Sequence, residues 1–302
     1  MAGKGTLILA SDFNALQSQA ALVLGTASGT YGYGQAVTSS QVAANARISV
    51  AQWSNLRNDL LRCIQHQTNS DYTSTLVVPS TSVKLTSEIY DAYKAVRDAI
   101  GPGRLALPAG QATRAVLNSA QRTASWNGTI THSVVINFAQ STLYPTTYES
   151  VYFFNAGGKL EISVSKTVGS GGSKNMSWDA LLGNIGVITF DYDTTTVSGS
   201  GTGSSIGFYD LTTSFQTIFT RALGIAESYY PNKYYIQAKV NNTTTRDQIT
   251  LNIVFADDSG QPNPPWGTDE MVDGTITSTV QTYRATGNNV TILQPTSPAS
   301  TL

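Results

Sequence analysis

Hydrophobic residues recur at helical spacing in the first third of the chain. The clearest run covers residues 50 to about 67, where apolar side chains return every three or four positions. Ser49 and Gln52 have the spacing of a capping box, in which a hydroxyl and an amide satisfy free backbone N–H groups at a helix start. Further helices are predicted at residues 12 to about 24, 87 to 100 and, from a weaker pattern, 111 to 123.

After about residue 125, apolar and polar residues alternate, which is typical of strands with one buried face. Residues 148–154 and 159–166 are predicted as two strands joined by a tight turn, because Asn-Ala-Gly-Gly at 155–158 supplies residues that tolerate positive φ. Trp178, Leu181 and Leu182 have helical spacing. The other predicted strands cover residues 130–138, 187–192, 234–241, 248–256 and 274–283, and a less regular one is possible at 76–85.

These patterns together predict an α+β protein with two domains. Residues 1–125 form the mainly helical part, and residues 126–302 form an antiparallel β-sandwich with long Gly/Ser loops. Several short strands separated by turns every 8–12 residues are the basis for the sandwich, since such spacing is typical of that architecture.

Low charge is the main compositional feature that bears on function. Charged residues make up 12% of the chain and the net charge is −1, with Lys and Arg scattered along the sequence. Nucleic-acid binding usually needs a concentrated basic surface, so we expect no nucleic-acid partner. No apolar run approaches the length of a membrane span, so we expect no membrane insertion and synthesis in a cytoplasm. Weak self-repulsion favours close packing between copies.

The sequence offers little reactive chemistry. His66 and His132 are far apart, and Cys63 is the single cysteine, so a metal cluster and an intrachain disulfide are not expected. A Ser-His-Asp arrangement is not ruled out, since triads are spatial, but the G-x-S-x-G motif is absent. Asp191 and Asp193 lie on one face of a strand end. With Asp179, or with Asp257 and Asp258, they could bind Ca²⁺ or act as glycosidase carboxylates; the alternative is that they form turns.

We therefore predict no catalytic, cofactor-binding or metal-binding residues and no enzymatic activity. The remaining candidates are aromatic residues, which can stack on sugar rings or anchor an interface. Core packing explains the same cluster equally well. The candidate interaction surface consists of Trp53, Tyr229, Tyr230, Tyr234 and Tyr235.

Several motifs, taken in order, resemble a β domain of virion structural and tail-fibre-like proteins of tailed bacteriophages. The resemblance extends over residues 130–258. Residues 32–35 (GYGQ) with 48–67 are similar to the front of such proteins in myophages and cyanophages. The motifs in the β domain are YFFNAGGKL at 152–160, SWxxLLxxIG at 177–186, GFYDLT at 207–212 and the strand at 249–258.

The resemblance implies a non-enzymatic particle component of a tail, baseplate or neck that is located in the virion and present in repeated copies. Its expected partners are copies of itself and other virion proteins, with the helical part attaching or assembling. The chain lacks a long repetitive shaft, which favours an adaptor or short appendage. The alternative is a host-surface carbohydrate-binding adhesion module that uses the tyrosine cluster and the loops 169–175 and 198–205. A depolymerase using Asp191 and Asp193 is the weaker third hypothesis.

Overall fold

The structure is a computed structural model that describes residues 8–26, 29–140, 149–167, 169–223, 229, 232–259 and 271–302. The chain divides into two compact units that interleave along the sequence. The helical unit comprises residues 1–113, 140–158 and 284–293, and the sheet unit comprises residues 114–139, 159–283 and 294–302. The predicted domains 1–125 and 126–302 stay a prediction, because units defined by contacts need not be folding domains.

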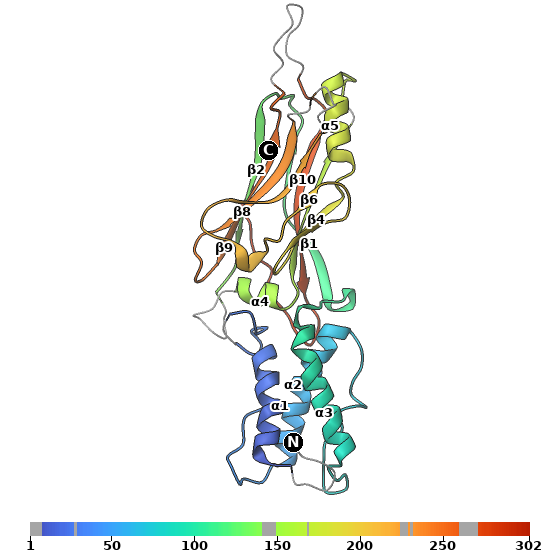
Figure 1. Cartoon of the computed structure of the whole chain (residues 1–302), viewed down its shortest axis with the longest axis vertical. Helices are drawn as coiled ribbons and strands as arrows, with labels where there is room; N and C mark the ends of the chain where they lie inside the picture. Colours follow the sequence, from blue (N-terminus) through green and yellow to red (C-terminus); the bar gives the residue numbers. More distant parts are fainter. Residues whose placement is uncertain are drawn as a thin grey trace, which may run out of the picture. The chain divides into compact units, whose positions relative to one another are not determined.

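Three helices form the body of the helical unit: α1 (Ala10–Leu24), α2 (Val50–Thr68) and α3 (Ser87–Ile100), which pack against one another (Figure 1). Three aromatic residues, one from each helix, form the centre of this packing. The ring of Trp53 lies edge-on to Phe13, with 5.2 Å between centroids, and to Tyr93, with 5.1 Å. Such edge-to-face pairs stabilise a core beyond their apolar burial.

The three predicted N-terminal helices are confirmed, with one difference in detail. The Ser49 N–H donates to Gln52 Oε1 at 2.7 Å and the Gln52 N–H donates to Ser49 Oγ at 3.2 Å, so the capping box forms. α1 begins at Ala10, two residues before the predicted start. Its first turn is closed by Asp12, whose carboxylate accepts the Leu9 N–H at 3.0 Å.

Several predicted elements are wrong. Residues 111–123 form the strand β1 (Ala112–Arg122) and not a helix, and β1 lies beside β10 (Ile276–Ala285). Side-chain hydroxyls link the two strands, as between Ser119 and Thr279 at 3.0 Å. Pairing with a distant strand therefore outweighed the local helical propensity of β1, which its sequence alone does not reveal.

Residues 148–154 were predicted as a strand, but residues 149–155 form the helix α4 (Glu149–Asn155). Tyr152, Phe153 and Phe154 are all fully buried, and a helix that is buried on every side has no polar face to reveal its period. The predicted hairpin turn at 155–158 is instead the end of this helix. Gly157 has a φ of 79°, and a Cβ there would lie 2.5 Å from the Leu105 carbonyl oxygen. Residues 76–85, all of them described, form no strand.

The sheet unit is an antiparallel β-sandwich of two five-stranded sheets. The first sheet has the order β1-β10-β3-β4-β5, and the second has the order β2-β9-β8-β7-β6. The α+β class predicted from the sequence is therefore confirmed. The remaining strands are β2 (Thr129–Asn137), β3 (Lys159–Lys166), β4 (Val187–Phe190), β5 (Thr195–Val197), β6 (Thr202–Gly203), β7 (Gln216–Ala222), β8 (Lys233–Val240) and β9 (Gln248–Ala256).

The predicted helix around Trp178 is confirmed as α5 (Ser173–Gly183), which contacts both β3 of the first sheet and β8 of the second (Figure 1). Trp178 is fully buried, and its ring lies 4.9 Å from that of Trp126 and 6.4 Å from that of Phe255. α5 therefore supplies a large aromatic side chain to the core of the sandwich.

The segment Gln294–Leu302 lies along the edges of the two sheets formed by β1 and β2. Thr296 exchanges backbone hydrogen bonds with Asn137 of β2, both at about 2.9 Å. The Asn118 amide of β1 donates to Ser297 Oγ at 3.0 Å and to the Pro298 carbonyl oxygen at 2.8 Å. These contacts occupy edge groups that would otherwise be open to another chain.

Candidate interaction surface

Both histidines are buried and uncharged at neutral pH. Burial lowers the pKa of His66 to about 4, although its Nε2 lies 3.2 Å from the Ala156 carbonyl oxygen. Burial also lowers the pKa of His132 to about 4. His132, on β2 of the second sheet, bonds to two residues of the first sheet. Its Nδ1 lies 2.9 Å from Ser278 Oγ on β10, and its Nε2 lies 3.0 Å from Asn118 Oδ1 on β1.

A serine hydroxyl approaches His132, but the arrangement is not a catalytic triad. Ser300 Oγ lies 2.8 Å from His132 Nε2 and also donates to Asn118 Oδ1 at 2.8 Å. The described hydrogen-bonding partners of the imidazole are neutral hydroxyl and amide groups, whereas a triad uses a carboxylate to stabilise the imidazolium. A lowered pKa also makes His132 a weak general base at neutral pH.

Cys63 is fully buried in α2. Burial raises the pKa of its thiol well above the usual range, and the nearby carboxylate of Asp59 adds to that shift. The thiolate is the nucleophilic form, so this cysteine is unreactive at neutral pH.

The aspartates predicted as possible ligands or catalytic acids take part in local contacts. Asp191 Oδ1 accepts the N–H groups of Asp193 and Thr194 at 3.3 and 3.1 Å, which is a turn. Three of the other four have a lysine partner: Asp179 pairs with Lys166, Asp257 with Lys174 and Asp258 with Lys233. Within the described residues no group of three His, Cys, Asp or Glu side chains could hold a metal ion.

The predicted interaction surface needs a correction, because most of its members lie in the core. Trp53 is buried between α1 and α3, and Tyr229 is buried as well. Tyr234 is fully buried between Phe219 and Phe255, with centroid distances of 5.9 and 5.0 Å. Tyr234 faces inward because β8 alternates buried and half-exposed positions along its length. Tyr230 lies outside the described residues.

Tyr235 is the member of the cluster that faces outward. It is half-exposed on β8, on the same side as Gln237 and Lys239. The register pairs Gln237 with Asn252 and Lys239 with Thr250 on β9. We call this set, together with Ser133 on β2, which pairs with Asn252, the outer face of the second sheet.

The outer face of the second sheet is lined by hydroxyl, amide and aromatic groups. The Lys233 ammonium lies 5.9 Å from the Tyr235 ring centroid, and that of Lys239 lies 4.6 Å from the ring of Phe215. Amides and hydroxyls exchange hydrogen bonds with polar ligands, and an exposed aromatic ring offers a surface for stacking. The face can bind a polar ligand or another protein surface.

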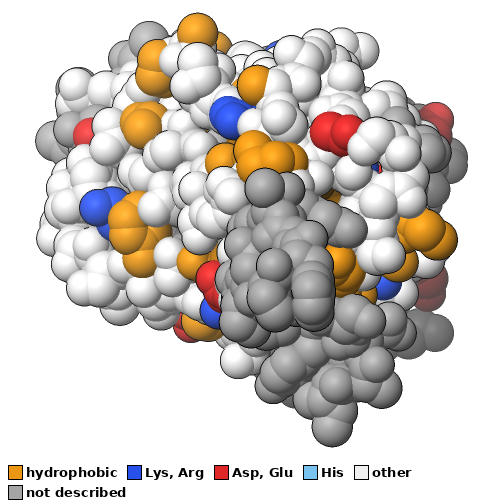
Figure 2. All heavy atoms as spheres, turned by 90° about the horizontal axis from the view of Figure 1, so that it is seen from above, with side chains coloured by type: hydrophobic (Ala, Val, Ile, Leu, Met, Phe, Trp, Pro, Cys, Tyr) orange, Lys and Arg blue, Asp and Glu red, His pale blue; other side chains and the backbone are white. Residues whose placement is uncertain are grey.

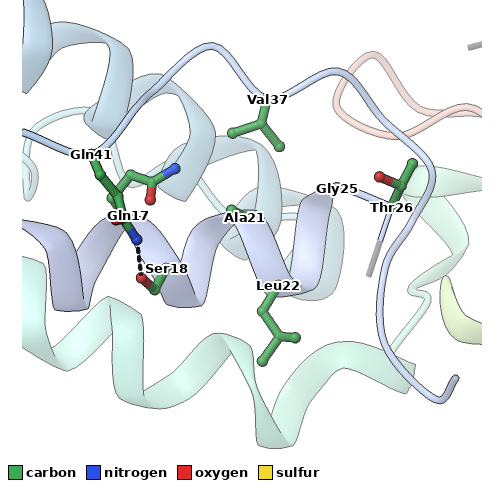
Figure 3. A pocket seen from close by; sticks show the side chains of 8 residues that line it. All are labelled: Gln17, Ser18, Ala21, Leu22, Gly25, Thr26, Val37 and Gln41. Carbon is green, nitrogen blue, oxygen red and sulfur yellow. Dashed lines mark hydrogen bonds between the residues drawn. The ribbon is translucent and has the colours of Figure 1, made fainter. Parts of the chain in front are cut away.

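A shallow groove in the helical unit is a second possible contact region. Figure 3 shows Ser18, Ala21 and Leu22 along α1, with Val37 and Gln41 on the segment that passes the helix. The groove has a volume of about 460 Å³, and no charged residue lines it. Gln41 Nε2 donates to Ser18 Oγ across it at 3.1 Å. It offers no acid or base for catalysis and suits contact with another protein.

The charges visible on one face of the molecule are dispersed. On the face drawn in Figure 2, the Lys and Arg side chains lie apart from one another among neutral groups. This face of the described residues therefore lacks the basic patch that phosphate backbones require.

No family model, curated protein or solved structure matches this chain. The resemblance to phage virion proteins therefore rests on the sequence motifs alone. Among the described helices, none has the length and apolar character needed to cross a membrane.

Proposed function

We propose that the protein is a structural component of a tailed-phage virion, an appendage or adaptor of the tail, baseplate or neck, that works through protein–protein contacts and not through catalysis. The observation that supports this proposal is that the potentially reactive side chains are buried or engaged in structural contacts. His66, His132 and Cys63 are buried in a neutral form. The aspartates considered as ligands form turns or ion pairs.

Two of the motifs behind the proposed kinship pack against each other in the helical unit. The Asn155 amide, at the end of α4, donates to the carbonyl oxygens of Tyr31 and Gly32 at 2.9 and 3.2 Å. Gly34 has a φ of 66°, and a Cβ there would lie 2.3 Å from the Tyr152 ring. The motifs at 32–35 and 152–158 therefore have a shared structural role, which supports a scaffold over a dispersed active site.

Light scattering on the purified full-length protein, together with mass spectrometry of gradient-purified particles, tests this proposal. A defined oligomer and its presence in the particles are expected. A protein that is strictly monomeric in solution and absent from purified particles would contradict the proposal.

A second candidate function is binding of a host-surface glycan, and the outer face of the second sheet favours it. Tyr235 offers a ring for stacking, and Gln237 and Asn252 offer amides for hydroxyl groups. We expect binding on a glycan array to fall at least tenfold in Tyr235→Ala and Gln237→Ala. Thr279→Ala, on the outer side of the first sheet, is the matched control and should bind normally. Wild-type protein that binds no glycan would exclude this candidate.

A further inference from the structure

A buried lysine and a buried aspartate meet in the sheet unit. Lys174 belongs to the first turn of α5, and Asp257 directly follows β9. Each side chain is 1% exposed, and Lys174 Nζ lies 2.5 Å from Asp257 Oδ2. Removing two charges from water is unfavourable unless their mutual attraction offsets the lost solvation, so a pair this deep is unusual.

The two oxygens of Asp257 have different surroundings. Oδ1 accepts a hydrogen bond from the Ser259 hydroxyl at 2.7 Å, and the Ser259 N–H is held by Asn232 Oδ1 at 2.9 Å. Oδ2 is buried and has no hydrogen bond of acceptable geometry among the described residues, although the Lys174 ammonium is within 2.5 Å. Lys174 Nζ is therefore in contact with the Asp257 carboxyl group, but its direction toward Oδ2 is not that of an ordinary hydrogen bond.

The neighbouring pair of Lys166 and Asp179 provides an internal comparison. Its lysine is equally buried, but Asp179 is 29% exposed, and Lys166 Nζ donates a regular hydrogen bond to Asp179 Oδ1 at 2.7 Å. Water can solvate that carboxylate, and the hydrogen bond directs the ammonium to the oxygen and not to the carbon. The two pairs differ in burial and in geometry, and both differences set Lys174 and Asp257 apart.

We propose that Lys174 and Asp257 join covalently through an amide bond between their side chains, an intramolecular isopeptide link. Nζ attacks Cγ of Asp257; the N–Cγ bond forms and the Cγ–Oδ2 bond breaks. Before the attack, one proton passes from the Lys174 ammonium to Oδ2, which gives a neutral amine with a free electron pair beside a carboxylic acid. A second proton passes from Nζ to Oδ2 after the attack, Oδ2 leaves as water, and the third proton stays on the amide nitrogen. No oxidant or other reactant is needed.

Three features of the site favour this reaction. The fold holds nucleophile and carbon together, which replaces a bimolecular encounter by an intramolecular one. Ser259 donates to Oδ1, the oxygen that gains negative charge in the tetrahedral intermediate and becomes the amide oxygen. The product is neutral, so the reaction removes two buried charges from an apolar environment. The link would tie α5 to the end of β9, whatever the function of the protein.

Mass spectrometry of the denatured wild-type protein tests the link directly. The expected mass is lower than the sequence mass by one water molecule, and trypsin should release a branched peptide joining residues 167–221 to residues 247–284, with no cleavage after Lys174. Lys174→Arg and Asp257→Ala should each have the full mass and no branched peptide. Lys166 and Asp179 should remain unlinked.

Two results would overturn the proposal. One is a wild-type protein with the full sequence mass and separate tryptic peptides. The other is loss of water without the branched peptide, which would place the dehydration elsewhere, for example at Asp273-Gly274.

Discussion

Two buried tyrosines in this protein differ in whether their hydroxyl groups form hydrogen bonds in the core. Tyr33 and Tyr234 are both almost fully buried. The Tyr33 hydroxyl donates to the Arg104 carbonyl oxygen at 2.7 Å and accepts from Gln67 Nε2 at 2.9 Å. The Tyr234 hydroxyl has no hydrogen-bonding partner among the described residues. A buried polar group without a partner lowers stability, so the two hydroxyls contribute with opposite sign.

Removing these hydroxyls should therefore have opposite effects. We expect Tyr33→Phe to lower the free energy of unfolding by about 1–3 kcal/mol, because two partners lose their hydrogen bonds. Tyr234→Phe should leave it unchanged or raise it by up to about 1 kcal/mol. Urea unfolding of the two variants and the wild type measures both values. Equal losses in the two variants would contradict the assignment of partners.

The buried histidines predict how stability depends on pH. Each has a pKa of about 4 in the folded protein and about 6.5 when unfolded, so between these values the unfolded chain binds more protons. The stability that comes from keeping these histidines neutral is therefore fully present above pH 6.5, and it is lost as the pH falls toward 4. We expect each histidine to lower the free energy of unfolding by about 1–2 kcal/mol when the pH falls from 7 to 5.

Chemical unfolding of His132→Gln at these two pH values checks the prediction. Between pH 7 and pH 5 the variant should lose about 1–2 kcal/mol less of its free energy of unfolding than the wild type, while the contribution of His66 remains. A pH dependence equal to that of the wild type would show that His132 is protonated equally in both states.

Whole elements were predictable where their pattern was local. The capping box and the apolar stripe of α2 identify that helix without any tertiary information, and the alternation of β8 and β9 identifies those strands. β1 could not be predicted, because its strand conformation depends on pairing with β10. α4 could not be predicted either, because a helix that is buried on all sides shows no alternation of apolar and polar residues. At the candidate surface, alternation was sufficient for β8. Tyr234 shares a side of the strand with Ile236 and Val240, which are apolar, whereas Tyr235 shares the other side with Gln237 and Lys239. The apolar side is the one expected to face inward, so the positions of these two tyrosines could be predicted from the sequence.

The packing of α4 against residues 32–35 yields a prediction for two glycines. Gly29 and Gly34 both have positive φ, of 72° and 66°, but only at Gly34 would a Cβ meet another group, the Tyr152 ring at 2.3 Å. Gly29→Ala should lower the free energy of unfolding by about 1–2 kcal/mol, because alanine disfavours this backbone conformation. Gly34→Ala should lower it by about 1–3 kcal/mol more, because the Tyr152 ring must also shift.

Thermal or urea unfolding of the two alanine variants provides the comparison. The difference between the losses of unfolding free energy in the two variants measures the contact with Tyr152, because both variants share the effect on backbone conformation. Indistinguishable losses would mean that α4 and the segment 32–35 do not pack as described.

The proposed covalent link would raise the stability of the sheet unit. A bond from Lys174 to Asp257 lowers the conformational entropy of the unfolded chain as a disulfide does, which is worth about 4.5 kcal/mol for a loop of this size. Lys174→Arg keeps the charge pair but cannot form the amide. We expect its melting temperature to fall by several degrees. An unchanged melting temperature would argue against a stabilising link.

We propose that the protein acts by shape and contact as a repeated part of a virion. A density map of the intact particle would locate the chain and so distinguishes this function from others. We predict that the two sheets and the three-helix core fit density at symmetry-related positions of the tail, baseplate or neck. A complete map in which every such position is filled by other proteins would contradict the claim.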